Sequence, residues 1–514
     1  MGGTMNVPAR RKGPTQPRRK VALAALAGAI IAAIAAFLWH SAPQTPHVAE
    51  QLSAHDTVGF IAMESPDRWL QELDRAAAGL SDEEKRNLAP LLSPDVRRAA
   101  LGFDPRSAAD WQKAGMDPER GLAMTLDARG ATGAMPTPFF WIAGGPPKLA
   151  KADALKWQAF AQWSVAALPS ALAPAATWTA AEGPKLDRDP VLRAAFADMP
   201  TGPRTAFYAH ADGLLALLKP QFEGNKLATL EHVAQRVRGL ALVIAPERVA
   251  GRLVLSSEGV ESLRQIFGNG PPKQKFSDHL PDDGVLALRV SLNLQELFDG
   301  LMTWLPPQWL EARLGLASTR LGMLAMTGLD WTQLERALSG QAVLALDLSA
   351  PATADTPVPW LALLAVRDGA VADAALTHLA QQGVQRGKPV RAAQIAGHAG
   401  WQLLAPPLVV VRVADTLIVA PSIAAAERAL HQPKPMADTA NLDGDVVLGL
   451  VFRPTAPHAA ELAGEGWLKK LAGFEPLSAA VRRDTHGLRL EASALPLASV
   501  LHLVTWVMRA PVAP

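Results

Sequence analysis

The first hydrophobic feature of the chain is a single uncharged run near its N-terminus. Residues 21–39 read VALAALAGAIIAAIAAFLW, nineteen positions without a charge, between Arg18-Arg19-Lys20 and His40. At 1.5 Å per residue a helix of this length spans about 28 Å, close to the roughly 30 Å hydrocarbon core of a bilayer. The run therefore predicts one transmembrane helix.

The charges around this run predict its orientation. Six Lys or Arg residues and no acidic residue occur in residues 1–20, and the next Lys or Arg is Arg68. Because positively charged flanks stay on the cytoplasmic side, residues 1–20 are predicted to form a basic cytoplasmic tail. Residues 40–514 are then expected in the periplasm, outside a bacterial inner (cytoplasmic) membrane that the chain crosses once.

A cleaved signal peptide is the main alternative to a retained anchor. It would need an apolar core of about 7 to 15 residues followed by a small-residue cleavage site. The run here is longer, and Trp39 and His40 occupy the places where small residues are needed, with Pro43 close behind. These residues favour an uncleaved signal anchor.

Two other features of the segment leave alternatives open. The pair Arg18-Arg19 raises a twin-arginine export signal, although the residues after it match weakly. Ala24, Gly28 and Ala32 form a small-xxx-small stripe on which a second helix could pack. Alanine fills nine of the nineteen positions, so such a stripe arises readily by chance. Whether a second copy of the chain pairs with this helix to form a homodimer is therefore left open.

Beyond a polar, proline-containing stalk at residues 40–54, one plan of strands and helices occurs twice. The earlier part predicts a strand at 55–63, a helix at 66–73, strands at 121–127 and 139–143, a helix from 151, a strand at 205–208, a helix at 214–218, strands at 240–244 and 251–255, and a helix at 260–267. The later part predicts a strand at 282–290, a helix at 293–298, strands at 341–347 and 360–366, a helix from 371, a strand at 446–452, a helix at 458–471, strands at 477–481 and 488–492, and a helix at 498–508. Asp56 corresponds to Asp283 and Gly121 to Gln341, and the offset between counterparts stays nearly constant. This spacing predicts an internal duplication.

The duplication sets the expected domain organisation. Residues 55–270 are predicted to form a first α+β module, 271–283 a linker without an apolar period, and 284–510 a second α+β module. Residues 394–430 carry strand-like stretches without a clear counterpart in the first module. Short turns and single interleaved helices favour a mixed or antiparallel sheet in each module, with helices on one face.

Composition removes several classes of function. The chain has 514 residues, of which 49% are hydrophobic and 19% charged, as expected for folded domains. The part of the chain after the basic tail contains 44 of the 50 Lys and Arg residues and all 48 Asp and Glu residues, which gives it a net charge of about −4. This balance does not indicate a nucleic-acid partner. The absence of cysteine excludes disulfides, thiolate metal sites and cysteine nucleophiles.

The candidate chemistry is sparse. The chain contains neither Gly-x-Ser-x-Gly, nor a phosphate-binding Gly-x-x-x-x-Gly-Lys-Ser/Thr loop, nor His-Glu-x-x-His. The twelve histidines are scattered, and a metal site assembled from distant residues stays open for two pairs, His210 with His232 and His378 with His398. Surface or loop histidines are the simpler interpretation. We assign no catalytic, cofactor-binding or metal-ligating residue and expect no cofactor.

Acidic and aromatic clusters have simple structural explanations. Asp282-Asp283 and the run 443–445 (Asp-Gly-Asp) each precede a strand, where turn residues are expected more often than a calcium loop. Core packing is the expectation for the tryptophans at positions 69, 141, 360 and 506. Trp304 and Trp309 flank Pro306-Pro307 and are the better candidates for an exposed patch that contacts sugars or lipid, although burial is still expected.

Taken with the duplicated plan, the chain resembles uncharacterised bacterial single-pass envelope proteins with a large repeated α+β periplasmic ectodomain. The resemblance rests on the strand openings at Asp56-Thr57-Val58 and Asp283-Gly284-Val285, and on Leu338-Ser339-Gly340 leading into a strand. It supplies no catalytic residues.

Two hypotheses for function follow from these patterns. The first is a membrane-anchored, non-enzymatic binding or scaffold module of the cell envelope, with an envelope protein, lipid or glycan partner. The second is a periplasmic enzyme, such as a hydrolase, with a site in the cleft between the two modules. A cleft with hydrogen-bonded Asp, His or Ser groups would favour the enzyme, and one lined with Leu and Trp would favour binding.

Overall fold

The structure is a computed structural model of the chain. It describes residues 45–54, 56–78, 80–87, 103–104, 106–127, 137–144, 156–160, 162–167, 185–200, 204–219, 222–245, 248–268, 276–282, 284–347, 360–404, 407–431, 436, 446–453 and 476–493. Within these ranges, no helix is long and apolar enough to cross a membrane. The predicted anchor at 21–39 and the predicted helices at 458–471 and 498–508 lie outside the described residues.

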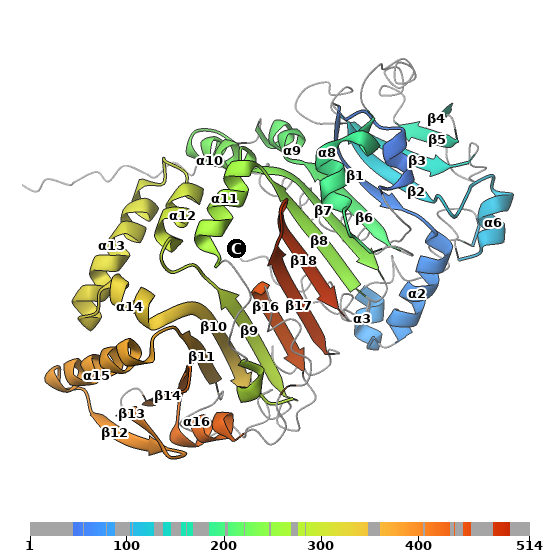
Figure 1. Ribbon diagram of the computed structural model, residues 1–514. Coiled ribbons are helices and arrows are strands. Elements are labelled where there is room, and N and C mark those ends of the chain that lie inside the picture. The colour runs from blue at the N-terminus through green and yellow to red at the C-terminus, as the bar shows by residue number, and fades with distance from the viewer. Residues whose placement is uncertain are drawn as a thin grey trace, which may run out of the picture.

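The described part is an α+β protein dominated by one large antiparallel sheet of eighteen strands. The strands are β1 (Thr57–Met63), β2 (Leu122–Asp127), β3 (Thr137–Ala143), β4 (Lys156–Phe160), β5 (Trp163–Ala167), β6 (Thr205–His210), β7 (Val237–Ala245), β8 (Arg248–Leu255), β9 (Val285–Ser291), β10 (Leu338–Asp347), β11 (Trp360–Val366), β12 (Val390–Ile395), β13 (His398–Leu404), β14 (Pro407–Val413), β15 (Thr416–Ala420), β16 (Val446–Arg453), β17 (Leu477–Arg483) and β18 (Gly487–Ser493). Figure 1 shows β7, β8, β18, β17, β16 and β9 side by side across the middle of the molecule.

Helices flank this sheet (Figure 1). They are α2 (Pro66–Ala78), α3 (Asp82–Asn87), α6 (Ala108–Lys113), α8 (Pro190–Phe196), α9 (Ala211–Leu218), α10 (Asn225–Ala234), α11 (Ser257–Ile266), α12 (Leu297–Trp304), α13 (Leu310–Thr327), α14 (Trp331–Ala337), α15 (Gly369–Gln385) and α16 (Ile423–Leu430), with short 3₁₀ turns η1 (His47–Glu50), η3 (Leu186–Arg188) and η5 (Phe276–His279). Local sequence explains several boundaries. Ser256 caps α11, Asp330 and Gln333 form a capping box on α14, and α13 ends at Gly328, whose φ is +72°.

Corresponding strands of the two halves follow one another in the same order outward from the centre of the sheet. Across the sheet it is β4-β5-β3-β2-β1-β6-β7-β8-β18-β17-β16-β9-β10-β11-β15-β14-β13-β12. The two halves meet where β8 pairs with β18, and we call this pairing the junction. Outward from it, each strand of the earlier half occupies the place of one strand of the later half, and β13 and β12 are additional.

The pairing register repeats the spacing seen in the sequence. Ile61 of β1 pairs with Met124 of β2. Leu288 is the counterpart of Ile61, because it lies as many positions after Ile61 as Asp283 lies after Asp56. Leu288 of β9 pairs with Leu344 of β10. Leu344 in turn follows Met124 at the offset that separates Gln341 from Gly121. The offsets found between strand openings thus reappear as one register in the two halves.

The earlier half has one main core on one face of the sheet. Phe60, Tyr208 and Ala241 pair across β1, β6 and β7 and pack with Leu192 and Phe196 of α8. Phe60 and Phe196 stack with ring centroids 6.3 Å apart. This packing buries α8 against the sheet close to the junction.

In the later half, helices cover both faces. Ile418 of β15 packs with Ala426 of α16, whereas its neighbour Leu417 packs with Ala372 of α15. Because adjacent residues of a strand point to opposite faces, α15 and α16 lie on opposite sides of the sheet. The prediction of helices on one face is wrong for this half.

Two other expectations need correction. Residues 394–430 do have partial counterparts, because β5 and β4 occupy the places beside β3 that β15 and β14 occupy beside β11. The segment 271–283 is not linker throughout, because Phe276 and Leu280 are buried in the core of the later half. Their apolar side chains were too few to produce a periodic pattern in the sequence.

Candidate binding surface

An apolar row crosses six strands at the centre of the sheet. Residues that pair side by side in an antiparallel ladder point to the same face. Followed from β1 to β17, the paired residues are Ile61, Phe207, Leu242, Gly251, Leu490 and Val481. The row crosses the junction, so both halves contribute to it.

A hollow of about 360 Å³ lies over this row. Its size falls within the roughly 300–1,000 Å³ that is usual for small-molecule sites. The other described residues that line it are Thr205, Leu240, Ala241, Ile244, Arg252, Leu253 and Leu488. Neither an acidic residue nor a histidine is among them, so the described lining offers no general acid or base. We call this surface the junction hollow.

Gly251 gives the junction hollow its depth. A β-carbon at this position would lie 3.3 Å from Cδ1 of Leu242 and 3.6 Å from Cβ of Leu490. A single methyl group therefore fits with a small movement of the Leu242 side chain. A larger side chain would occupy the hollow itself.

Apolar residues continue along the same face on both sides of the hollow. Val481 pairs with Leu448, and Leu448 pairs with Val290, which shares its face with Leu288 two residues earlier. Leu288 pairs in turn with Leu344. These three leucines are exposed, as are Leu240 and Phe140 on the same face of the earlier half. Exposed apolar patches of this kind commonly mark interaction surfaces.

The opposite face of the junction carries a row of arginines. Arg252 pairs with Arg489, and Arg489 pairs with Arg482. Like charges directly opposite each other destabilise a sheet unless acids compensate them. Among the described residues, the acids in contact with this row are Asp198, Asp484 and Glu491. These carboxylates offset the positive charge of the row.

Arg252 is the buried centre of this network. Its Nη1 donates to the carbonyl oxygens of Ala194 and Ala197, each at 2.7 Å. Its Nη2 lies 2.8 Å from Oδ2 of Asp484, as an ion pair rather than an aligned hydrogen bond. Ala194 and Ala197 belong to the end of α8, whereas Asp484 lies in the β17–β18 turn. Arg252 therefore joins the two halves on the face opposite the junction hollow.

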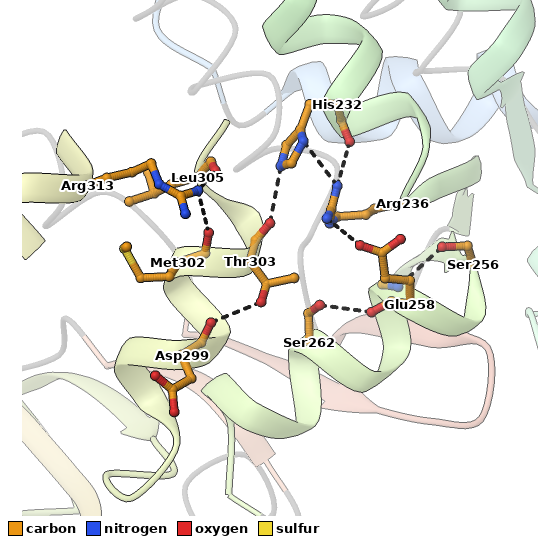
Figure 2. A network of polar contacts seen from close by, with 11 residues as sticks. His232, Arg236, Ser256, Glu258, Ser262, Asp299, Met302, Thr303, Leu305 and Arg313 are labelled. Atoms are coloured by element: carbon orange, nitrogen blue, oxygen red, sulfur yellow. Dashed lines mark hydrogen bonds and ion pairs between the residues drawn. The ribbon is translucent and has the colours of Figure 1, made fainter. Parts of the chain in front are cut away.

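A second polar network joins α10, α11 and α12, as Figure 2 shows. Arg236 bonds to Glu258 through Nη2, and its Nη1 donates to the carbonyl oxygen of His232 at 3.1 Å and lies 3.3 Å from His232 Nδ1. Because Nδ1 accepts from the guanidinium, the ring proton belongs on Nε2, which lies 3.1 Å from the carbonyl oxygen of Thr303. His232 thus connects two helices.

The same region fixes the corner between α12 and α13 (Figure 2). Arg313 Nη1 donates to the carbonyl oxygens of Met302 at 3.1 Å and Leu305 at 2.9 Å. Gln308 Nε2 donates to Thr229 Oγ1 at 3.3 Å, which connects the corner to α10. The start of α13 is therefore held in place by polar contacts.

The four histidines considered as metal ligands have the following surroundings. His232 is bonded as described above, and His210 lies immediately before α9. His378 lies in α15 beside Gly328, and His398 lines a hollow of about 520 Å³ between α15 and β12–β14. Within the described ranges, no group of three or more His, Asp or Glu residues could hold a metal ion.

The larger hollow beside α15 is polar at its rim. Arg412 Nε lies 2.7 Å from Asp373 Oδ1, and its Nη2 lies 2.5 Å from Asp373 Oδ2. The bonded guanidinium holds the pKa of the Asp373 carboxyl below its usual range. Because the two groups satisfy each other, we regard the junction hollow as the stronger candidate despite its smaller volume.

Some of the acidic and tryptophan residues considered in the sequence have the positions expected of them, and others do not. Asp282 forms an ion pair with Arg453 at 2.5 Å beside the start of β9, which fits a structural role. Asp283 and residues 443–445 lie outside the described residues. Trp69 and Trp141 are fully buried, as expected, whereas Trp360 is half-buried and Trp506 lies outside the described residues.

Trp309 contradicts the expectation of burial. It is exposed, whereas Trp304 is only half-buried. The apolar run around Pro306-Pro307 lies at the corner between α12 and α13, and Trp309 immediately precedes α13. The sequence alone does not show that this corner leaves Trp309 exposed.

Glu64 is the most perturbed acid of the described part. It follows β1 and accepts a hydrogen bond from the backbone N–H of His47 at 3.1 Å. Burial raises its pKa to about 8, while this hydrogen bond and the charge of Arg204 oppose the rise. The sequence did not predict that Glu64 and Arg204 interact, because the two residues are far apart in the chain.

Known proteins provide no guide to this surface. Neither a protein-family model, nor a curated protein, nor a solved structure matches the chain.

Proposed function

We propose that the chain is a non-enzymatic binding protein of the bacterial cell envelope, tethered to the inner membrane through residues 21–39. Its ligand surface is the junction hollow with the exposed leucines beside it. The observation that carries this proposal is an apolar row that both halves build at their junction, on the face of the sheet opposite the Arg252 network.

The chemistry of the junction hollow favours binding over catalysis. Proton transfer needs a titratable group within hydrogen-bond reach of the reacting atom. Thr205 and Arg252 are the polar residues of the described lining, and the guanidinium of Arg252 is bonded on the opposite face. A hydrolase site built from this described lining would lack an acid, a base and an oriented nucleophile.

The apolar lining of the junction hollow also limits the kind of partner that it can bind. Sugars present hydroxyl groups that need polar partners when they are buried, and an apolar hollow cannot supply them. Beyond the hollow, exposed leucines continue on the same face across β16, β9 and β10. We therefore favour an apolar segment of an envelope protein over a glycan or a small enclosed ligand.

We also propose that the two halves are internally homologous modules that arose by duplication. The repeated strand order and the repeated register of β1–β2 and β9–β10 support this. Such a duplication places two related edge strands, β8 and β18, against each other, as in a two-fold dimer whose subunits have become one chain. The binding surface then exists only when both modules are present.

The proposal is tested by crosslinking and affinity purification of the tagged full chain from membranes. We expect one envelope protein to copurify reproducibly with the wild type and to be lost with Gly251→Val, which fills the junction hollow. Gly322→Val in α13 is the matched control, because, apart from its chain neighbours and the backbone of its own helix, no atom lies within 4 Å of the place that its β-carbon would take. Equal recovery of partners by all three proteins, or recovery of none, contradicts the binding surface.

Membrane orientation is tested separately. A reporter that is active only in the cytoplasm, fused after Pro514, is expected to be silent. Activity of that fusion would contradict the periplasmic location without bearing on the junction hollow.

A further inference from the structure

Helix α13 carries an apolar stripe that the described protein does not cover. Leu310, Leu314 and Leu324 have 62%, 59% and 45% of their surface exposed. At 100° per residue, these positions fall within an arc of about 80° on the helix surface. Trp309, immediately before the helix, is 45% exposed. We call these four residues the α13 stripe.

Polar contacts near both ends of α13 help to fix the position of the α13 stripe. Arg313 bonds to two carbonyl oxygens of the preceding corner (Figure 2), and Gln308 bonds to Thr229 of α10. At the other end, Arg386 Nη2 donates to the carbonyl oxygen of Ala325 at 3.3 Å. The helix is thus held at both ends while its apolar side faces outward.

The expected anchor ties the described part of the chain to a membrane. Five residues, 40–44, separate the predicted membrane helix from Thr45, where the described part begins. Even fully extended, five residues reach no more than about 18 Å. Thr45, where the folded part begins, is therefore held near the membrane surface.

We propose that the α13 stripe inserts shallowly into the periplasmic face of the membrane in which residues 21–39 are anchored. This proposal rests on the proposed anchor. Trp309 suits the interface between headgroups and acyl chains, and the three leucines suit the region just below it. A second, shallow contact beside the anchor would fix the orientation of the sheet, and hence of the junction hollow, relative to the membrane.

The absence of cysteine allows a direct depth measurement on the full chain. We would introduce Leu314→Cys or Leu324→Cys, attach a nitroxide label and reconstitute the full-length protein in vesicles of phosphatidylethanolamine and phosphatidylglycerol. Leu404→Cys on β13 is the control, because Leu404 is 46% exposed and Leu324 is 45% exposed. Relaxation by oxygen reports exposure to the bilayer, and relaxation by a water-soluble nickel chelate reports exposure to water.

The expected result is strong relaxation by oxygen and weak relaxation by nickel at positions 314 and 324, with the reverse at position 404. Relaxation by nickel at all three positions, in protein that floats with the vesicles, overturns the stripe's membrane contact and leaves the anchor intact. Spin–spin broadening between labels at position 314 also overturns it, because it would mean that a second copy covers the stripe. Protein that does not float with the vesicles contradicts the anchor, and with it the membrane tether of the proposed function and the membrane contact of the α13 stripe.

Discussion

Single residues of the described part show how backbone conformation and space act together. Gly121 has a φ of +70°, and a β-carbon there would lie 1.7 Å from the carbonyl oxygen of Met63. Gly387 has nearly the same φ, +69°, with no atom within 4 Å of that position. The two glycines therefore share a conformational requirement but differ in the space around them.

Replacing each glycine by alanine separates these two effects. Gly387→Ala is expected to cost about 1 kcal/mol of unfolding free energy, because only the left-handed conformation is penalised. Gly121→Ala is expected to cost at least about 2 kcal/mol more, because the β1 carbonyl must also move. Urea unfolding of the two variants beside the wild type measures both. Equal losses would contradict the close approach of residue 121 to β1.

Glu64 predicts a specific dependence of stability on pH. Its pKa rises from 4.5 to about 8 on folding, so between these values the folded state binds a proton that the unfolded state has released. Stability must then fall as pH rises through this window. Relative to Glu64→Gln, the wild type is expected to lose at most about 1.4 kcal/mol per pH unit.

The comparison requires unfolding curves of both proteins across this pH window. Glu223→Gln, at an exposed site, is the matched control and should follow the wild type. Parallel pH profiles for wild type and Glu64→Gln would contradict the protonated, buried state of Glu64.

At the scale of elements, the junction depends on charge balance as well as on the β8–β18 ladder. Asp484 accepts hydrogen bonds through Oδ1 from the backbone N–H groups of His486 and Gly487, and its other oxygen faces Arg252. An asparagine retains the turn contacts and removes the charge. The substitution therefore isolates the ion pair.

We expect Asp484→Asn to lower the unfolding free energy by about 1 to 3 kcal/mol, because Arg252 is almost fully buried and beside Arg489. Glu261→Gln, which breaks the exposed pair of Glu261 with Arg264, should cost less than about 1 kcal/mol. Chemical unfolding of the three proteins tests this. If Asp484→Asn is no more destabilising than the surface control, the arginine row does not hold the junction.

Alternation along the chain predicted most strands that build the surface. Leu488, Leu490 and Ala492 alternate with Arg489 and Glu491, and they form β18 with its apolar and charged faces as observed. The strands β4 and β5 were missed, since the apolar residues between 156 and 167 do not alternate cleanly. Helix α13 was also missed, because Gly315 and Gly322 interrupt its sequence and no side chain caps its start.

At the scale of the whole molecule, the predicted duplication anticipated the repeated register but not the continuous sheet. The offsets from Asp56 to Asp283 and from Gly121 to Gln341 are visible in the sequence itself. The pairing of Leu253 with Leu488, far apart in the chain, depends on which two edge strands meet, and no local pattern specifies it. For the same reason, the junction hollow could be expected as a cleft between modules, while the residues lining it could not be named.

The junction hollow is proposed as the surface that meets a partner. The most direct test is a photo-crosslinking amino acid placed in the full chain at position 240 or at position 233. Leu240 lines the hollow and is 39% exposed, whereas Val233 lies on α10 and is 38% exposed. Irradiation of cells is expected to give a discrete crosslinked product from position 240 and none from position 233. No product from position 240, or the same products from both positions, would contradict the assignment of the junction hollow as the binding surface.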